Sequence, residues 1–223
     1  MKYWKPAGRL MRFDALDRNG GAFPSYVVAW RIEDEPDVWT DRALKFKEFK
    51  KGYAKAGACV MRDAVAEVLA LHDIPPNQAT LCTALKSSGT GADPSSILYK
   101  TGAFIAKALG VNWQPDLFTK TPHRSLRSIS GAAARDAEVE NVYTAAPLAV
   151  PSTLIVLDDF ITRGATLNDM NRALQQANPR TPMIAVALAK NETAHFGRAC
   201  GRAVDNTHVS ADWEALWQAS FEK

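Results

Sequence analysis

Residues 154–166 decide the fold of this chain, and they read LIVLDDFITRGAT. The four apolar residues at the start are typical of a strand buried in a parallel sheet. Two acids, Asp158 and Asp159, then lead into a short polar loop that opens the next helix. A strand, a loop and a helix in this order predict an α/β domain, in which ligands bind at the carboxyl ends of the strands.

The segments around this unit continue the same alternation. We expect a strand at 25–31, preceded by a turn at Asn19-Gly20-Gly21, and further strands at 80–85, 114–118 and 183–189. Residues 41–72 should be mainly helical, with Gly52 and Gly57 as interruptions. Another helix should start at Asp93-Pro94 and end at Gly110, and the aromatic residues of 211–221 fit a last, packed helix.

This order of elements predicts an α/β fold with an open, mainly parallel sheet and helices on both faces. It also predicts two parts of the chain. Residues 1–75 should form an N-terminal hairpin and helical appendage packed on the core, and residues 76–223 should form the α/β core itself.

Composition excludes several other classes of protein. The 223 residues are 47% hydrophobic and carry a net charge of +3, which does not by itself indicate nucleic acid. The three cysteines have neither metal-ligand nor disulfide-framework spacing, which favours a reducing compartment. We find neither an apolar run of membrane-spanning length nor a signal peptide, so we expect a cytoplasmic protein.

The loop at 162–166 has the chemistry of a phosphate site. Its backbone N–H groups and the positive end of the following helix would face an incoming anion, and Gly164 permits close approach of the backbone. Asp158 and Asp159 would accept hydrogen bonds from sugar hydroxyls. The alternative is purely structural: Asp158 is an acid at a helix entry and Thr166 is an N-cap.

Residues 154–166 resemble the thirteen-residue signature of type I phosphoribosyltransferases, with four apolar residues, two acids and a Thr/Gly/Thr loop. The chain resembles the ComF-like branch more weakly, from about Leu44 to Lys190, through Asn141-Val142-Tyr143 and the basic residue after the fourth strand. Phe160 and Arg163 depart from the signature. Many members of that branch carry an N-terminal cysteine zinc cluster, which we do not expect here, because no cysteine precedes Cys59.

The resemblance implies phosphoribosyl pyrophosphate as ligand, together with Mg²⁺. Its implied catalytic residues are Asp158 and Asp159, which would also serve the metal indirectly, through ribose or water. The implied phosphate-binding residues are Thr162, Arg163, Gly164, Ala165 and Thr166. The implied pyrophosphate loop contains Lys86, Ser87 and Ser88, and the implied lid contains Lys120, His123 and Arg124. A solvated turn and an exposed basic loop are the simpler interpretations of the last two segments.

Three hypotheses about function follow. The first is an enzyme that transfers the phosphoribosyl group to a nitrogen acceptor. The second is a regulatory or DNA-uptake-related module that binds a nucleotide or sugar phosphate without turnover. The third, ranked last, is a nucleic-acid partner bound by the lysines of 45–55 and the basic loop. The expected small-molecule partner is phosphoribosyl pyrophosphate or a nucleoside monophosphate, no membrane partner is expected, and a homodimer stays open.

Overall fold

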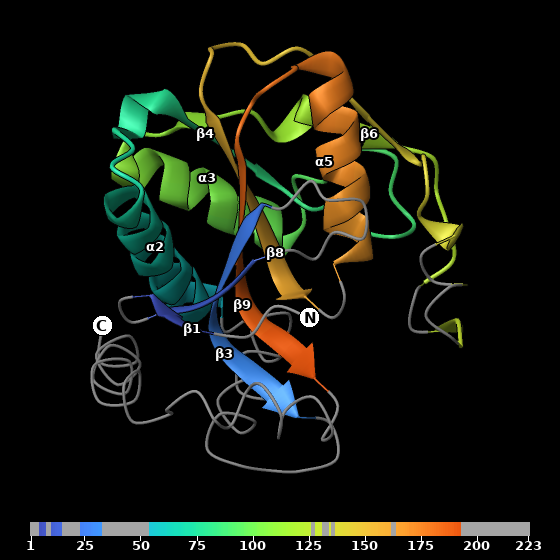
Figure 1. Cartoon of the computed structure of the whole chain (residues 1–223), viewed down its shortest axis with the longest axis horizontal. Coiled ribbons are helices and arrows are strands. Elements are labelled where there is room, and N and C mark those ends of the chain that lie inside the picture. The colour runs from blue at the N-terminus through green and yellow to red at the C-terminus, as the bar shows by residue number, and fades with distance from the viewer. Residues whose placement is uncertain are drawn as a thin grey trace.

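The computed structural model describes residues 5–7, 10–14, 23–32, 54–125, 128–130, 134, 137–161 and 164–192 (Figure 1). Several predictions lie outside these residues. They concern the turn at 19–21, the lysines of 45–51, the loop residues Thr162 and Arg163, and the helix at 211–221.

A mainly parallel sheet forms the centre of the fold, with the strand order β1-β2-β3-β9-β8-β4-β5. The five parallel strands are β3 (Pro24–Ile32), β9 (Met183–Glu192), β8 (Thr153–Ile161), β4 (Ala79–Thr83) and β5 (Asn112–Trp113). Strands β1 (Lys5–Ala7) and β2 (Leu10–Asp14) add an antiparallel edge next to β3. The predicted fold class, an α/β fold with an open, mainly parallel sheet, is therefore confirmed.

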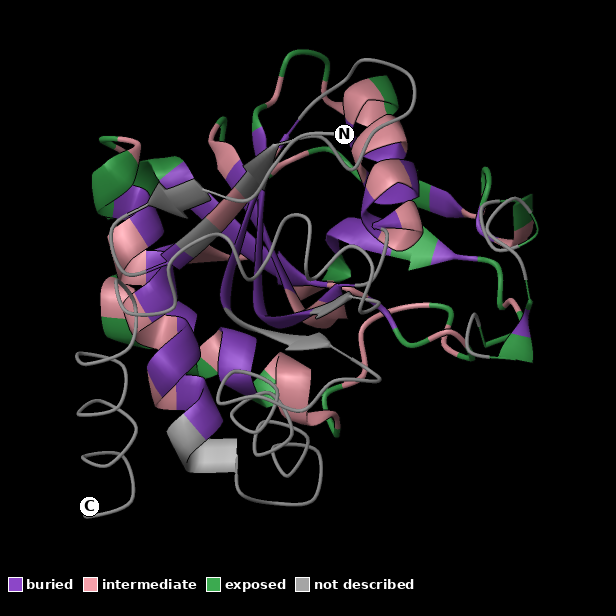
Figure 2. Cartoon of the chain, turned by 60° about the horizontal axis from the view of Figure 1, so that its bottom comes forward, coloured by how far each residue is buried: buried purple, intermediate pink, exposed green. Residues whose placement is uncertain are grey.

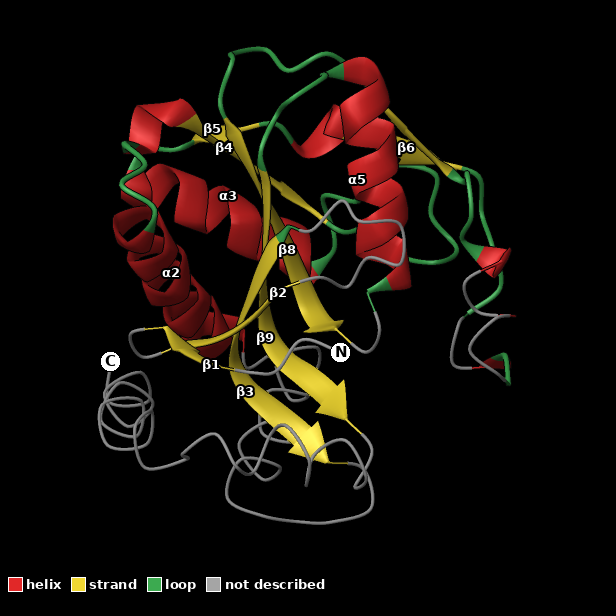
Figure 3. Ribbon diagram, viewed as in Figure 1, coloured by secondary structure: helices red, strands yellow, loops and turns green. Residues whose placement is uncertain are grey.

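Among the residues that the structure describes, three long helices cover the two faces of this sheet. Helices α2 (Ala54–Leu71) and α3 (Ile97–Leu109) lie on one side and α5 (Ala165–Ala177) on the other, as Figure 3 shows with the sheet seen nearly edge-on. The central strands are buried, and the helices expose only their outer faces (Figure 2). Residues from β2 to β9 contribute to one hydrophobic core, so both sides of the expected boundary near residue 75 pack together.

A small second sheet projects beside the main one. Strand β6 (Phe118–Lys120) pairs antiparallel with β7 (Tyr143–Ala145), and the short 3₁₀ turns η2 (Pro76–Gln78) and η3 (Pro115–Leu117) precede β4 and β6. Helix α5 packs against β7.

Three local predictions are wrong. The segment 114–118 is not one strand, because Gln114 donates to the carbonyl of Leu81 at 3.0 Å and the chain then turns through η3. Helix α3 does not start at Asp93: its N-cap is Ser96, whose hydroxyl accepts from the N–H of Tyr99. Gly57 is buried inside α2 and does not interrupt it.

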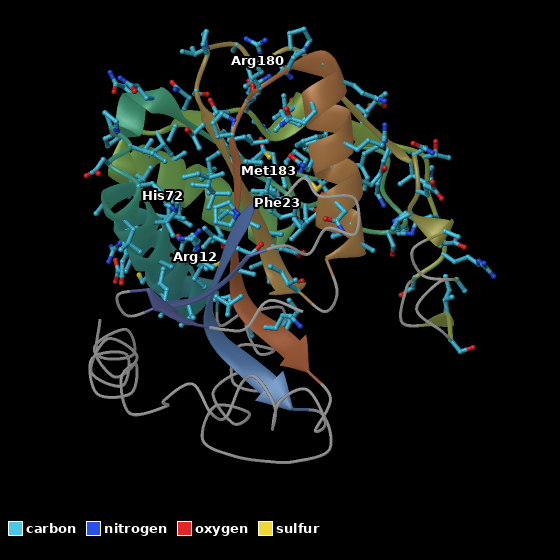
Figure 4. The ribbon with its side chains drawn as sticks, in the orientation of Figure 1. Arg12, Phe23, His72, Arg180 and Met183 are labelled. Atoms are coloured by element: carbon cyan, nitrogen blue, oxygen red, sulfur yellow. The ribbon has the colours of Figure 1, made fainter. Side chains whose placement is uncertain are left out.

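The N-terminal strands are joined to α2 by a polar contact as well as by apolar packing. The Tyr26 hydroxyl on β3 lies 2.7 Å from Nε2 of His72, just beyond the end of α2. On β2, the Arg12 guanidinium lies 5.9 Å from the centre of the Tyr26 ring. Figure 4 labels Arg12 and His72. Tyr26 is fully buried, so the hydrogen bond with His72 satisfies a hydroxyl that would otherwise be costly to bury.

Replacing Gly110 with alanine should lower the free energy of unfolding by about 1 kcal/mol, because its φ of 72° is a left-handed conformation that a β-carbon disfavours. The confirmed C-cap of α3 needs this conformation. Gly91→Ala is the matched control, since a β-carbon there meets nothing within 4 Å and its φ is not positive. Urea unfolding of both variants measures the difference, and equal losses would contradict the prediction.

Candidate functional site

A cavity of about 740 Å³ opens where strand β4 ends and its neighbour β8 continues. The last β4–β8 pair is Thr83 with Leu157, and the N–H of Ala84 donates to the Leu157 carbonyl at 2.8 Å. Strand β8 then runs on to Ile161, paired with β9 on its other side. The two acids, which were predicted to follow the strand, therefore lie inside β8, in the part that continues past the end of β4.

Separate segments of the chain meet in this cavity. From β8 come Asp158, Asp159 and Phe160, and from the first turn of α5 comes Thr166. From the loop after β4 come Lys86 and Ser87. The structure thus brings the two acids, one residue of the predicted phosphate loop and two of the predicted pyrophosphate loop to one hollow. Ser88 and Arg124 are not among its described lining residues.

Both carboxylates are half-buried, and hydrogen bonds from backbone N–H groups fix their orientation. Oδ1 of Asp158 accepts from the N–H of Asp159 at 2.8 Å, and Oδ1 of Asp159 accepts from the N–H of Phe160 at 2.8 Å. Successive residues of a strand point to opposite faces. Because both acids line the cavity, the hollow wraps around the end of β8.

Helix α5 begins at this cavity with a glycine. Gly164 is the N-cap, with a φ of 78°, and its carbonyl accepts the N–H of Asn168 at 2.8 Å. Ala165 starts the helix, and Thr166 in its first turn lines the cavity. The first backbone N–H groups of a helix lack partners within it and carry its positive end, so this corner of the cavity favours an anion. The alternative assignment of Thr166 as the N-cap is wrong.

Lys86 is paired with an acid that the sequence did not single out as a site residue. Its ammonium lies 2.5 Å from Oδ2 of Asp93, while Oδ1 of Asp93 accepts from the N–H of Ser95 at 2.9 Å. The hydrogen bond from Lys86 lowers the pKa of Asp93 to about 2, with help from Ser95. The lysine side chain is 59% exposed, so its ammonium stays within reach of a soluble anion.

The residues predicted to form a lid occupy three different environments. Lys120 belongs to β6 and is buried, whereas His123 lines the cavity. Arg124 is exposed and forms an ion pair with Glu138, which raises the pKa of the arginine and lowers that of the acid. Closure of this segment over a ligand stays a prediction.

Burial gives Lys120 a pH-dependent effect on stability. Desolvation lowers the pKa of its ammonium to about 8, so between pH 8 and its ordinary pKa the folded chain binds fewer protons than the unfolded chain. Stability must therefore rise with pH across that window. We expect the free energy of unfolding of the wild type, minus that of Lys120→Met, to increase when urea titrations are moved from about pH 7.5 to 10. A difference that does not change with pH would contradict this.

Sequence reasoning missed several residues that line the cavity. These are Thr83 on β4, Asp93, Ser95 and Ser96 before α3, and Ser125 beyond β6. The polar run from Asp93 to Ser96 is visible in the sequence, where it predicts a helix start. Its role at the cavity depends on the ion pair with Lys86, a contact across seven residues that no local pattern indicates.

The carboxylate oxygens of the cavity suit a metal ion that a bound ligand would also coordinate. Within the described part of the chain, no group of three or more His, Cys, Asp or Glu residues is arranged to bind a metal ion. Two neighbouring carboxylates beside the positive end of α5 would fit Mg²⁺, which is typically bound by few protein ligands and by the phosphates of a substrate.

The fold and the cavity define an α/β domain with a parallel five-stranded sheet and a polar hollow at the carboxyl ends of β4 and β8. No protein-family model matches this chain, and no curated protein is significantly similar to it. Among the helices that the structure describes, none combines the length and apolar character needed to cross a membrane.

Proposed function

We propose that this protein binds phosphoribosyl pyrophosphate together with Mg²⁺ and transfers the phosphoribosyl group to a nitrogen acceptor. The observation that carries the proposal is the meeting, in one cavity, of the acids of β8, the start of α5 and the loop after β4. A ligand with two hydroxyls between two phosphate groups needs acceptors flanked by two anion sites, and the cavity supplies both kinds of group.

Each part of the ligand has a matching part of the cavity. The 5-phosphate binds at the first turn of α5, where Gly164 and Thr166 present the end of the helix. The ribose hydroxyls donate to Asp158 and Asp159. The pyrophosphate binds at the loop with Lys86 and Ser87, where the lysine acts as a point charge.

The residues of the chain would aid transfer by charge and by position. Asp158 and Asp159 steady the positive charge that develops on the ribose when the bond to pyrophosphate breaks and the bond to nitrogen forms. Binding of the 5-phosphate, remote from the reacting carbon, fixes the orientation of the sugar. Mg²⁺, when bound, would neutralise charge on the leaving pyrophosphate.

Release of pyrophosphate tests the proposal. The protein is mixed with phosphoribosyl pyrophosphate, Mg²⁺ and a panel of bases and amines, and free pyrophosphate is measured. We expect release that depends on both the protein and one of the acceptors. Binding without release in every mixture would favour a regulatory module, and absence of binding would overturn the proposal.

A further inference from the structure

The turn that follows β4 is tied to a buried lysine on another strand. The Ser87 carbonyl accepts two hydrogen bonds, one from Nζ of Lys120 at 3.0 Å and one from the N–H of His123 at 3.2 Å. The N–H of Lys120 donates in turn to the carbonyl of Thr90 at 2.9 Å. Two carbonyls of the turn are thus bound to β6 and the residues just after it.

Lys120 is built into the core at this point. The residue is 4% exposed, and its ammonium lies 5.6 Å from the centre of the Tyr143 ring on β7. The β6–β7 pairing places Lys120 directly opposite Tyr143. A soluble ligand reaches a buried ammonium far less readily than an exposed one. Lys120 is therefore placed to hold the loop rather than to bind a ligand.

The two bonds to Ser87 decide where the backbone donors of the turn point. In a trans peptide the carbonyl and the following N–H point in opposite directions, and the described residues contain no cis peptide. With the Ser87 carbonyl directed at Lys120, the N–H of Ser88 points away from Lys120. Within the described part of the chain, the N–H groups of Ser87 and Ser88 donate to no acceptor. They are donors that an anion would satisfy.

We propose that Lys120 is a positioning residue that shapes the turn Lys86–Thr90, so that Ser87, which lines the cavity, binds pyrophosphate through its N–H group. This inference rests on the proposed function and deepens it, because it names the residue that orders the pyrophosphate loop. Lys120 itself does not touch the ligand.

Two binding probes separate this role from a general structural one. Lys120→Met keeps the length and apolar stem of the side chain and removes its donor. We expect it to weaken binding of Mg²⁺-pyrophosphate by about tenfold or more, because a small misplacement of the turn is costly. Binding of ribose 5-phosphate, held by α5, should change by less than about twofold. The matched control is Lys107→Met, an exposed lysine in the last turn of α3, which should change neither.

The outcomes are distinguishable. If the wild type binds both probes but Lys120→Met loses both equally or loses neither, the inference fails and the proposed function stands. If the wild type binds neither probe, both fail.

A measurement on the unaltered protein covers the case in which Lys120→Met does not fold. Hydrogen exchange should show the Gly89 N–H, which donates to the Lys86 carbonyl at 2.9 Å, already protected without ligand. Exchange at the rate of an unstructured chain would overturn the inference.

Discussion

Replacing Asp158 and Asp159 together with asparagine is expected to lower kcat/KM for pyrophosphate release by at least about 100-fold, the scale on which a charge-stabilising group contributes to catalysis. Asparagine has nearly the shape of aspartate, and its Oδ1 can still accept the N–H groups of Asp159 and Phe160. The loss would therefore come from the missing negative charge beside the ribose, and the end of β8 would keep its conformation. Pyrophosphate release under saturating Mg²⁺ measures the effect.

The control for this variant removes two charges elsewhere. Asp73→Asn with Asp116→Asn changes two exposed acids, one after α2 and one in η3, by the same chemistry. It should leave turnover and binding within about twofold of the wild type, as surface charges remote from a site usually do. Equal activity of the Asp158/Asp159 variant and this control would remove the acids from the mechanism.

Replacing Asp169 with alanine is expected to give the largest loss of stability, about 3 kcal/mol, because it strands buried polar partners. The carboxylate is buried in α5 and accepts the N–H groups of Asn141 and Tyr143 at 2.9 and 2.8 Å. It also accepts Nε of Arg172 at 2.6 Å, and Arg172 donates onward to the Tyr143 carbonyl at 2.7 Å. This network joins α5 to β7.

Urea unfolding of Asp169→Ala and Asp169→Asn tests the network. Asparagine retains an acceptor but loses the charge and one accepting oxygen, so its loss should be smaller. A loss below about 1 kcal/mol for the alanine variant, the typical effect of a point mutation, would show that the network contributes little.

The sequence predicted the elements whose signals are local. The apolar runs of β3, β4, β8 and β9 have the composition of buried strands, and Gly110 marks the end of α3 because only a few residues tolerate its left-handed conformation. These features depend on neighbours within a few residues, so pattern alone identifies them.

The errors arose where distant contacts decide the structure. Helix α3 has its N-cap at Ser96 and not at Asp93, because Asp93 is engaged by Lys86 and Ser95. The segment at 114–118 is not one strand, because Gln114 is bound by β4. Strand β8 extends to Ile161 because β9 continues beside it, although β4 has ended.

The candidate site was predicted more fully on β8 and α5 than elsewhere. Residues 154–166 are contiguous, so their motif is visible in the sequence, and the structure places both acids and Thr166 at one cavity. The position of Lys120 in a basic segment predicts a place in a lid. Its burial against Tyr143 follows from the β6–β7 pairing, which joins residues 23 positions apart.

Calorimetric titration of the wild-type chain with phosphoribosyl pyrophosphate and Mg²⁺ tests the central claim most directly. We predict one saturable site per chain, competed by both ribose 5-phosphate and Mg²⁺-pyrophosphate, and strongly weakened by the Asp158/Asp159 double substitution. No measurable binding, or binding that the double substitution leaves unchanged, would contradict it.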